Sequence, residues 1–79
     1  DDAACIDADA EIERGVIIYG DSRIEGQSVI CSGTVLRDAI IKDSIIGRNC
    51  LLENSYVAKS KISDNKTISA FEKIENMSI

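Results

Sequence analysis

Aliphatic residues recur at every sixth position through the first half of the chain. From Ile6 the sequence divides into hexads that each begin with Ile or Leu, and the fifth residue of each hexad is small or aliphatic. An amphipathic helix needs apolar residues at i, i+3, i+4 and i+7, and a long strand needs strict alternation, so neither fits. The pattern instead predicts very short strands that alternate with corners. The hexads begin at Ile6, Ile12, Ile18, Ile24, Ile30 and Leu36, and their fifth residues are Ala10, Val16, Ser22, Ser28, Thr34 and Ile40.

The spacing becomes shorter after Leu36, but the pattern of residue types continues. The aliphatic residues now follow one another at steps of five or six, and residues 36–51 and 52–67 repeat the same five-five-six order. We expect each aliphatic residue, and the residue four positions later, to point into a common core. Gly, Asn and Asp between them suit corners, because they tolerate positive φ. The later aliphatic positions are Ile41, Ile46, Leu52, Val57, Ile62, Ile68 and Ile74.

Three short sides would close one triangular coil of eighteen residues, or of sixteen where the spacing is shorter. Successive coils would stack as parallel strands about 4.8 Å apart. A helical fold is disfavoured because the frequent Gly, Asn, Asp and β-branched residues are poor helix formers. The sequence therefore predicts an all-β fold, a parallel β-helix of about four short triangular coils in one domain, residues 1–79. The expected coils are roughly 6–17, 18–35, 36–51, 52–67 and 68–79, with end caps at 1–5 and 71–79.

The two caps are expected to cover the end coils, where strand edges and apolar surface are exposed. At the N-terminal end the acidic segment DDAACIDADAEIE is the candidate shield. At the other end the hypothesis is a plug, in which Phe71, Met77 and Ile79 fold across the last coil.

The hexads resemble the bacterial transferase hexapeptide repeat, in which [ILV]-x-x-x-small-x units form a left-handed parallel β-helix. The stretch IIKDSIIGRNCLLENSYVAKSKISDNKTISAF, from Ile40 to Phe71, is similar to the first β-helix coils after the catalytic domain of sugar-phosphate nucleotidyltransferases. Within that group the likeness is to enzymes that join N-acetylglucosamine-1-phosphate uridyltransferase and glucosamine-1-phosphate acetyltransferase activities. The resemblance covers about Ile6 to Ile74, and it implies left-handed coils and a homo-oligomer, namely a trimer.

The resemblance does not supply catalytic residues. The family's acyltransferases hold acyl-CoA between neighbouring β-helices and use a His as general base, and this chain has no His. Where the family has an I-G-P-F turn followed by an Arg, this chain has Ser69 and Ala70 in place of Gly-Pro, and Glu75 near the position of the Arg. We therefore expect no catalytic residue in this chain, and acetyl-CoA as a cofactor only if the active-site residues lie outside it.

Nucleotidyl transfer would require a separate α/β domain with a Gly-rich phosphate loop of G-x-G-T type. The glycines of the first half instead fall one per hexad, and we interpret them as corner residues: Gly15, Gly20, Gly26 and Gly33. A nearby acidic run could hold a hard cation, but no charge-dense loop fixes its geometry, so a solvated cap or corner is favoured and no metal site is predicted. This run is Asp7, Asp9, Glu11 and Glu13.

Charge and cysteine content narrow the class of protein. The 79 residues carry 14 acidic and 9 basic side chains, a formal charge of -5, which argues against nucleic acid or an anionic membrane surface as the main partner. No segment is long and apolar enough to span a bilayer. The three cysteines have no C-x-x-C spacing, and their odd number indicates reduced thiols and a cytoplasmic protein.

Two cysteines and a set of lysines invite sharper interpretations. Cys50 is the fifth residue of its hexad, and we interpret it as a small core residue rather than a nucleophile, because no base is available to activate it. Cys31 follows an aliphatic position and is expected to point outward, with a reactive thiol as the alternative. A weak anion-binding face is possible at the lysines of the last coils, although a solvated polar face is favoured. These are Lys59, Lys61, Lys66 and Lys73.

The two tyrosines are the large outliers of the repeat. Tyr19 comes directly after an aliphatic position, so its ring is expected to face outward. Tyr56 falls on an inward position that usually holds a small residue. Outward aromatic rings suit contact with a neighbouring subunit or domain, and packing along the protein's own coil is the alternative.

These observations favour a non-catalytic β-helix module that positions or oligomerises a sugar-phosphate nucleotidyltransferase-like enzyme. Its partner would be a further copy of the chain or a neighbouring catalytic domain. One alternative is part of an acetyl-CoA-dependent transferase whose active-site residues lie outside this chain. The other is a free-standing small β-helix that binds a partner or ligand. The missing His and the altered G-P-F segment favour the non-catalytic module.

Overall fold

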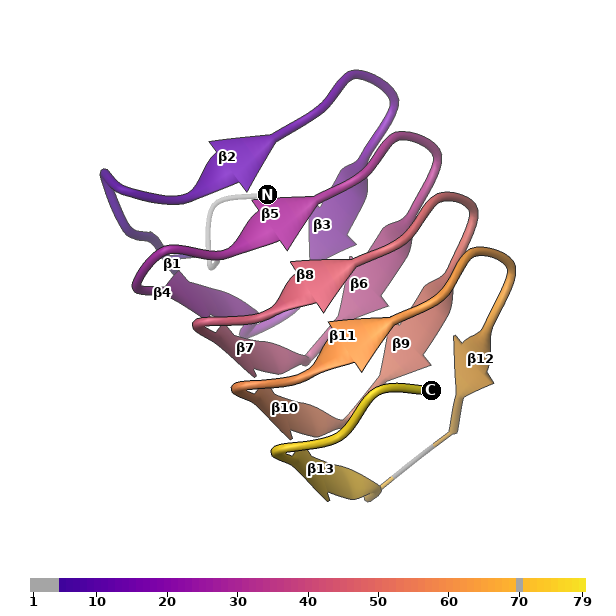
Figure 1. The fold of residues 1–79 in the computed structure, drawn as a ribbon. Helices are drawn as coiled ribbons and strands as arrows, with labels where there is room; N and C mark the ends of the chain where they lie inside the picture. Colours follow the sequence, from indigo (N-terminus) through magenta and orange to yellow (C-terminus); the bar gives the residue numbers. More distant parts are fainter. Residues whose placement is uncertain (1–4, 70) are drawn as a thin grey trace.

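The chain folds into a stack of short strands arranged around three sides of a prism (Figure 1). The structure is a computed structural model that describes residues 5–69 and 71–79, and within these ranges it contains thirteen strands and no helix. Each strand is only two or three residues long, as the hexads predict. The strands are β1 (Cys5–Ile6), β2 (Glu11–Ile12), β3 (Ile17–Tyr19), β4 (Arg23–Glu25), β5 (Val29–Ile30), β6 (Val35–Arg37), β7 (Ile40–Lys42), β8 (Ile45–Ile46), β9 (Leu51–Glu53), β10 (Tyr56–Ala58), β11 (Lys61–Ile62), β12 (Thr67–Ile68) and β13 (Lys73–Glu75).

Every third strand belongs to the same sheet, and all pairings in the three sheets are parallel. The sheet orders are β1-β4-β7-β10-β13, β11-β8-β5-β2 and β12-β9-β6-β3. The register follows the two spacings of the sequence: Glu11 pairs with Val29, eighteen residues later, whereas Val29 pairs with Ile45, sixteen residues later. The prediction of an all-β parallel β-helix with about four coils is confirmed.

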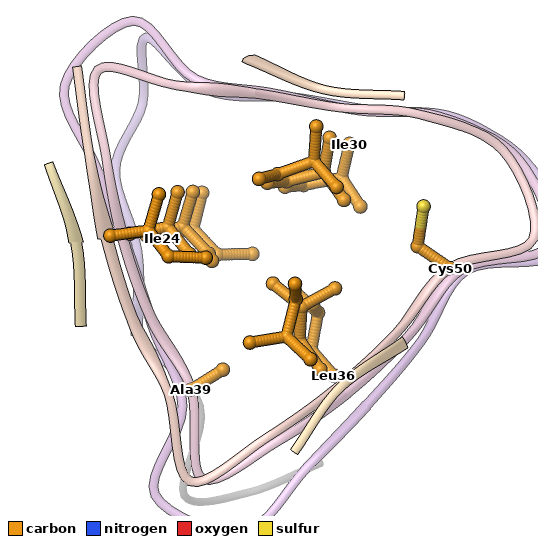
Figure 2. Packing of buried hydrophobic residues seen from close by; sticks show 12 residues of the cluster. Ile24, Ile30, Leu36, Ala39 and Cys50 are labelled. Atoms are coloured by element: carbon orange, nitrogen blue, oxygen red, sulfur yellow. The ribbon is translucent and has the colours of Figure 1, made fainter. Parts of the chain in front are cut away.

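The core is three columns of aliphatic side chains, one from each sheet. Figure 2 looks along the coils and shows Ile24, Ile30 and Leu36 pointing inward from the three sides of a triangle, and all three are at most 1% exposed. The aliphatic residues of the next coil follow the same columns and are fully buried. In the first coil the corresponding residues are less buried, because a neighbouring coil covers them on one side alone. Ile12 and Ile18 are partly buried, and Ile6 is 49% exposed.

The shortened corners correct two predicted side-chain directions. In a five-residue side the second inward residue comes three positions after the aliphatic residue, not four, because one corner residue is missing. Ala39 is therefore completely buried and the predicted Ile40 is 36% exposed. Likewise Ser55 takes the inward position predicted for Tyr56, whose side chain is only half-buried. A single left-handed residue makes these tight bends, as at Asp38 with φ of 50°.

Buried hydroxyl groups connect successive coils at one corner. The backbone N–H of Ser44 donates to Oγ of Ser28 at 3.2 Å, that of Ser60 to Oγ of Ser44 at 3.1 Å, and that of Met77 to Oγ of Ser60 at 3.0 Å. Each of these hydroxyls also donates to a backbone carbonyl oxygen of its own coil, at 2.8–2.9 Å. The inward serines are thus hydrogen-bonded links between coils as well as small core residues, a role that the hexads did not reveal.

The C-terminal segment continues the coil, and the predicted plug is wrong. Strand β13 pairs with β10, and the N–H of Ser63 donates to the carbonyl oxygen of Ile79 at 2.6 Å. This bond matches the one that Gly47 donates to Ile62 in the preceding coil. Phe71 is 87% exposed and covers no part of the last coil. Of the predicted N-terminal cap, residues 1–4 lie outside the described residues.

Candidate functional site

The outer surface of the sheet β12-β9-β6-β3, which we call the β3 face, carries two straight columns of side chains. In each of its three-residue strands the middle residue points into the core, so the residues before and after it point outward. Parallel pairing stacks the corresponding residues of successive coils directly over one another. The residue before each core residue therefore belongs to one column of the β3 face, and the residue after it belongs to the other.

The first column is apolar. Ile17 pairs with Val35, Val35 with Leu51, and Leu51 with Thr67, so three aliphatic side chains and one threonine form an uninterrupted row. Ile17 is 54% exposed, and Val35 and Leu51 are each partly exposed. We call Ile17, Val35 and Leu51 the apolar column.

The second column mixes an aromatic ring with opposite charges. The guanidinium carbon of Arg37 lies 5.8 Å from the centroid of the Tyr19 ring, and Nη1 of Arg37 lies 3.8 Å from Oε2 of Glu53. Ser69 follows in the next coil. The Arg37 and Glu53 side chains are 55% and 38% exposed, so water screens this ion pair and it contributes little to folding stability. Both groups remain accessible for contacts with another molecule.

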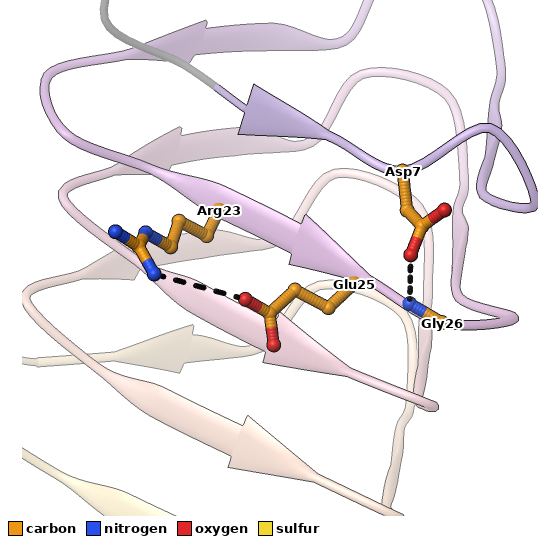
Figure 3. Close-up of polar contacts among 4 residues, drawn as sticks. All are labelled: Asp7, Arg23, Glu25 and Gly26. Carbon is orange, nitrogen blue, oxygen red and sulfur yellow. Dashed lines mark hydrogen bonds and ion pairs between the residues drawn. The ribbon is translucent and has the colours of Figure 1, made fainter.

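The other two outer faces mix apolar and charged residues; the β4 sheet, for example, presents Ile40 and Tyr56. On the outer surface of the β4 sheet, five strand residues are charged, and they include the ion pairs Arg23–Glu25 and Lys73–Glu75, each at 3.9 Å (the first drawn in Figure 3). The outer surface of the β2 sheet presents two aliphatic strand residues, Val29 and Ile45. The β3 face presents the three residues of the apolar column and Tyr19. Only on this face do three aliphatic side chains follow one another without interruption through three successive strands.

The predicted acidic run is divided between corner contacts and solvent. Oδ2 of Asp7 accepts a hydrogen bond from the N–H of Gly26 at 3.2 Å (Figure 3), and Oε1 of Glu13 accepts one from the N–H of Ser32 at 2.9 Å. Asp9 and Glu11 are exposed. Among residues 5–69 and 71–79, no three His, Cys, Asp or Glu side chains gather closely enough to hold a metal ion. Two of the four carboxylates therefore bind the corner of the next coil.

The cysteines lie in different environments. Cys50 is 2% exposed, and its Sγ donates a weak hydrogen bond to the carbonyl oxygen of Ser63 at 3.1 Å, in agreement with its interpretation as a core residue. Cys31 is partly exposed beside a core residue. Its burial and, to a smaller extent, the carboxylate of Glu13 raise the pKa of the Cys31 thiol above the ordinary value. A raised pKa lowers the thiolate fraction at neutral pH and so opposes the reactive-thiol alternative.

The lysines of the last coils do not share one face. Lys59 and Lys61 line an open hollow at a corner, together with Asp43 and Asn76. Lys73 lies on β13, where it pairs with Glu75 and approaches the Tyr56 ring to 5.8 Å. The less favoured anion-binding face finds no support, since the carboxylates of Asp43 and Glu75 stand among the cations.

The two tyrosines both point outward, but on different faces. Tyr19 is 38% exposed on the β3 face, as predicted. Tyr56 lies on the outer surface of the β4 sheet, between its strand partners Ile40 and Lys73. The apolar column itself was not recognised from the sequence. Its signal is present, because an aliphatic residue precedes the core residue at positions 17, 35 and 51, which the sequence places one coil apart.

The described residues contain no helix that could cross a membrane.

Comparison with known proteins extends over nearly the whole chain. The chain is 38% identical over 71 residues to the bifunctional protein GlmU of Clostridium acetobutylicum, and 32% identical over 74 residues to that of Streptococcus gordonii. These matches cover 89% and 92% of this chain but only 16% of each relative, so the chain spans about one sixth of their length. No protein-family model matches.

A solved structure of a GDP-perosamine N-acetyl transferase variant from Caulobacter crescentus aligns with 91% of this chain and 48% of that chain, at a TM-score of 0.38 and 13% identity. That likeness is too distant to support further argument. The similarity to the GlmU proteins confirms the resemblance seen in the hexads. The chain is a parallel β-helix that is similar to one part of these relatives.

Proposed function

Since the chain is a hexapeptide-repeat β-helix similar to part of the bifunctional protein GlmU, we propose that it is a non-catalytic structural module that self-associates through the β3 face. The parent activity would be that of a sugar-phosphate nucleotidyltransferase-like protein, as the resemblance implies. The observation that carries the proposal is the apolar column, which is in register through three coils, with Ile17 exposed and Val35 and Leu51 partly exposed.

Exposed apolar rows of this kind are typical of interaction surfaces. Single surface aliphatic residues are ordinary, whereas a contiguous apolar patch bordered by polar residues marks a contact site. Interface centres are depleted in charge and enriched in aromatic residues and Arg, and here Tyr19 and Arg37 border the apolar column. A stable interface needs about 800 Å² from each partner, a small fraction of the 4665 Å² surface of this chain.

A catalytic role finds less support in the residues. The chain has no His to act as general base, and Ser69, Ala70 and Glu75 replace the family's Gly-Pro and Arg. The three ion pairs on the outer faces each join a cation to a glutamate, Arg23–Glu25, Arg37–Glu53 and Lys73–Glu75. An acetyl-CoA-binding role would depend on residues outside this chain.

Sedimentation velocity over a range of protein concentrations tests the proposal. We expect the chain to form a homo-oligomer, and we expect Val35→Glu to return it to a monomer because a charge then stands in the apolar column. The matched control is Ile45→Glu, which places the same charge at a 43% exposed aliphatic position of the β2 sheet and should leave association unchanged. A chain that stays monomeric at every concentration contradicts the proposal, as does equal loss of association in both variants.

Titration with acetyl-CoA tests the competing role. The proposal expects no saturable binding to this chain. Saturable binding that Val35→Glu does not affect would support the acetyl-CoA-dependent alternative instead.

A further inference from the structure

We propose that an open hollow at one corner of the last coils is a docking site for an arginine side chain in a basic segment of a partner protein. The hollow lies where the β3 face meets the outer surface of the β4 sheet, and it includes no residue of the apolar column. It therefore goes beyond the proposed self-association and does not depend on it.

Two columns of side chains line the hollow, one from the corner and one from the neighbouring strands. The corner column is formed by left-handed residues of successive coils, Asp38, Asn54 and Phe71. The strand column is formed by outward residues of β7, β10 and β13, which pair in register (Figure 1): Ile40, Tyr56 and Lys73. The hollow therefore brings the rings of Phe71 and Tyr56 to one corner together with charged groups.

Phe71 sets this corner apart from the others. Among the described residues, eight other than glycine have a positive φ, and six of these are Asp or Asn, which tolerate the left-handed conformation. The exceptions are Lys59 and Phe71. Phe71 has a φ of 66° and a side chain that is 87% exposed, so burial of its ring does not offset the cost of its backbone. Such outliers cluster at sites that hold a ligand, and here the exposed ring is the group on offer.

The charges around the hollow favour a cationic occupant. Asp38 and Glu72 line it, and Lys73 is the one basic residue among its lining residues. Oδ1 of Asp38 accepts a hydrogen bond from the N–H of Asp21 at 2.7 Å, whereas within the described residues the exposed Glu72 carboxylate has neither a hydrogen bond nor an ion pair. With two carboxylates against one ammonium group, in a chain of formal charge -5, the hollow attracts positive charge.

Lys73 demonstrates that a cation fits against this surface. Its Nζ lies 5.8 Å from the centroid of the Tyr56 ring, within the range of a cation–π contact. Across residues 5–69 and 71–79 the other such contact is that of Arg37 with Tyr19, so neither involves Phe71. The ring of Phe71 is therefore open to a cation from another molecule.

Arginine matches this combination of groups better than lysine. Its planar guanidinium stacks on aromatic faces, pairs with carboxylates through several N–H donors and is less strongly hydrated than an ammonium group. The guanidinium would lie on the Phe71 ring and donate to the Glu72 carboxylate. Its methylene groups would contact Ile40, which is 36% exposed. Arginine is also enriched at protein interfaces, which favours a partner protein as its source.

A heteronuclear NMR titration with the peptide GSRGSRG tests the proposal. We expect saturable shifts of the backbone amides around the hollow, and weaker binding of GSKGSKG because an ammonium group does not stack as guanidinium does. The same peptide with citrulline in place of arginine keeps the planar shape without the charge and should not bind. Shifts spread evenly over the prism, no saturable binding of GSRGSRG, or equal binding of the citrulline peptide would each overturn the proposal.

Matched substitutions separate the hollow from the general attraction of an acidic protein for a basic peptide. We expect Phe71→Asn to raise the Kd for GSRGSRG by about two- to fivefold, the loss of one exposed cation–π contact. Asparagine suits the left-handed backbone, so weaker binding would not reflect misfolding. The control is Ile45→Asn, which removes a 43% exposed aliphatic side chain from the β2 sheet and should leave the Kd unchanged.

A second pair of variants tests the carboxylate. Glu72→Gln and Glu11→Gln each remove one charge from an exposed glutamate, but only Glu72 lines the hollow. We expect Glu72→Gln to raise the Kd more than Glu11→Gln. Equal effects in this pair, or equal effects of Phe71→Asn and Ile45→Asn, would overturn the assignment of the site.

Replacement of Lys73 provides a test with the opposite sign. Because Lys73 occupies the Tyr56 ring and repels a second cation, we expect Lys73→Gln to lower the Kd for GSRGSRG. Lys66→Gln removes an equal charge from an exposed lysine outside the hollow and should lower it less. A Kd for Lys73→Gln that is unchanged, raised, or lowered only as far as in Lys66→Gln would contradict a cation site at this corner.

Discussion

The backbone N–H of Cys50 donates a hydrogen bond to Oγ1 of Thr34, one coil earlier, at 3.2 Å. The same Oγ1 donates to the carbonyl oxygen of Gly47 at 2.6 Å, and Thr34 is completely buried. One side-chain oxygen thus satisfies a donor and an acceptor of the neighbouring coil at a corner that water does not reach.

Thr34→Val tests this link between coils. Valine has nearly the shape of threonine but leaves the N–H of Cys50 and the carbonyl oxygen of Gly47 without this partner, so we expect a loss of about 1–3 kcal/mol in the free energy of unfolding. Urea denaturation measures it. Thr34→Ser keeps the hydroxyl and should lose less than Thr34→Val. A Thr34→Val variant as stable as the unsubstituted protein would contradict a stabilising role for these two hydrogen bonds.

The position of a coil in the stack should set the cost of a core cavity. Ile46 is completely buried between two coils, whereas Ile18 is partly buried in the first coil. We expect Ile46→Ala to lower the free energy of unfolding by about 2–5 kcal/mol and Ile18→Ala to lower it less. If Ile46→Ala does not fold, Ile46→Val against Ile18→Val gives the same comparison on a smaller scale. A larger loss at Ile18 would contradict the nearest-neighbour view of this stack.

Phe71 should be replaceable with a gain in stability. Its φ is 66°, a left-handed conformation that Asn54 adopts at the equivalent corner one coil earlier, and its side chain is 87% exposed. We expect Phe71→Asn to raise the free energy of unfolding by about 0.5–1 kcal/mol, because Asn tolerates this conformation better than other residues with a Cβ. Thermal or urea denaturation measures the change, with Phe71→Ala as control. A less stable Phe71→Asn variant would reveal a packing role for the ring.

Cys31 should react with iodoacetamide over a higher pH range in the folded protein than in the urea-unfolded chain. Burial and then Glu13 raise the pKa of its thiol, so less thiolate is present at a given pH. The folded state also holds the proton more tightly, so this group stabilises the fold below the unfolded-state pKa, and the contribution is lost as pH rises through the folded-state pKa. Mass spectrometry of the Cys31 peptide measures alkylation, and Glu13→Gln should move the profile toward lower pH. Identical pH profiles of alkylation for the folded and unfolded chain would contradict a raised pKa of the Cys31 thiol in the folded protein.

The aliphatic spacing was sufficient to predict the fold because each core residue occupies a fixed place in a repeated coil. Ile24, Ile30 and Leu36 reach the core as the hexads require. Ile40 and Tyr56 were placed incorrectly because a missing corner residue moves the inward position without changing the types of residue around it. The spacing between aliphatic residues shows that a side has five residues instead of six. It does not show which position of the corner is missing, and therefore which residue points inward.

The candidate site was harder to infer than the core. Sequence reasoning followed inward positions, whereas the apolar column consists of the outward residues that precede them on one sheet only. Ile17 and Val35 are eighteen residues apart and Val35 and Leu51 sixteen apart, so no fixed period identifies them. They become a row only when the pairing register is known.

Corners of this β-helix differ in length by one residue, and this difference shows where the fold tolerates insertions and deletions. Most β-sheets tolerate a one-residue deletion poorly, since the shift turns every following side chain to the opposite face. Here the side from Leu36 to Ile41 is one residue shorter than the side from Ile18 to Ile24, yet Ile24 still pairs with Ile41. The corner absorbs the deletion and the strands on both sides keep their orientation. Extra residues could be accommodated in the same places, so the corners are where such a prism can acquire loops, and with them new chemistry, without rebuilding its core.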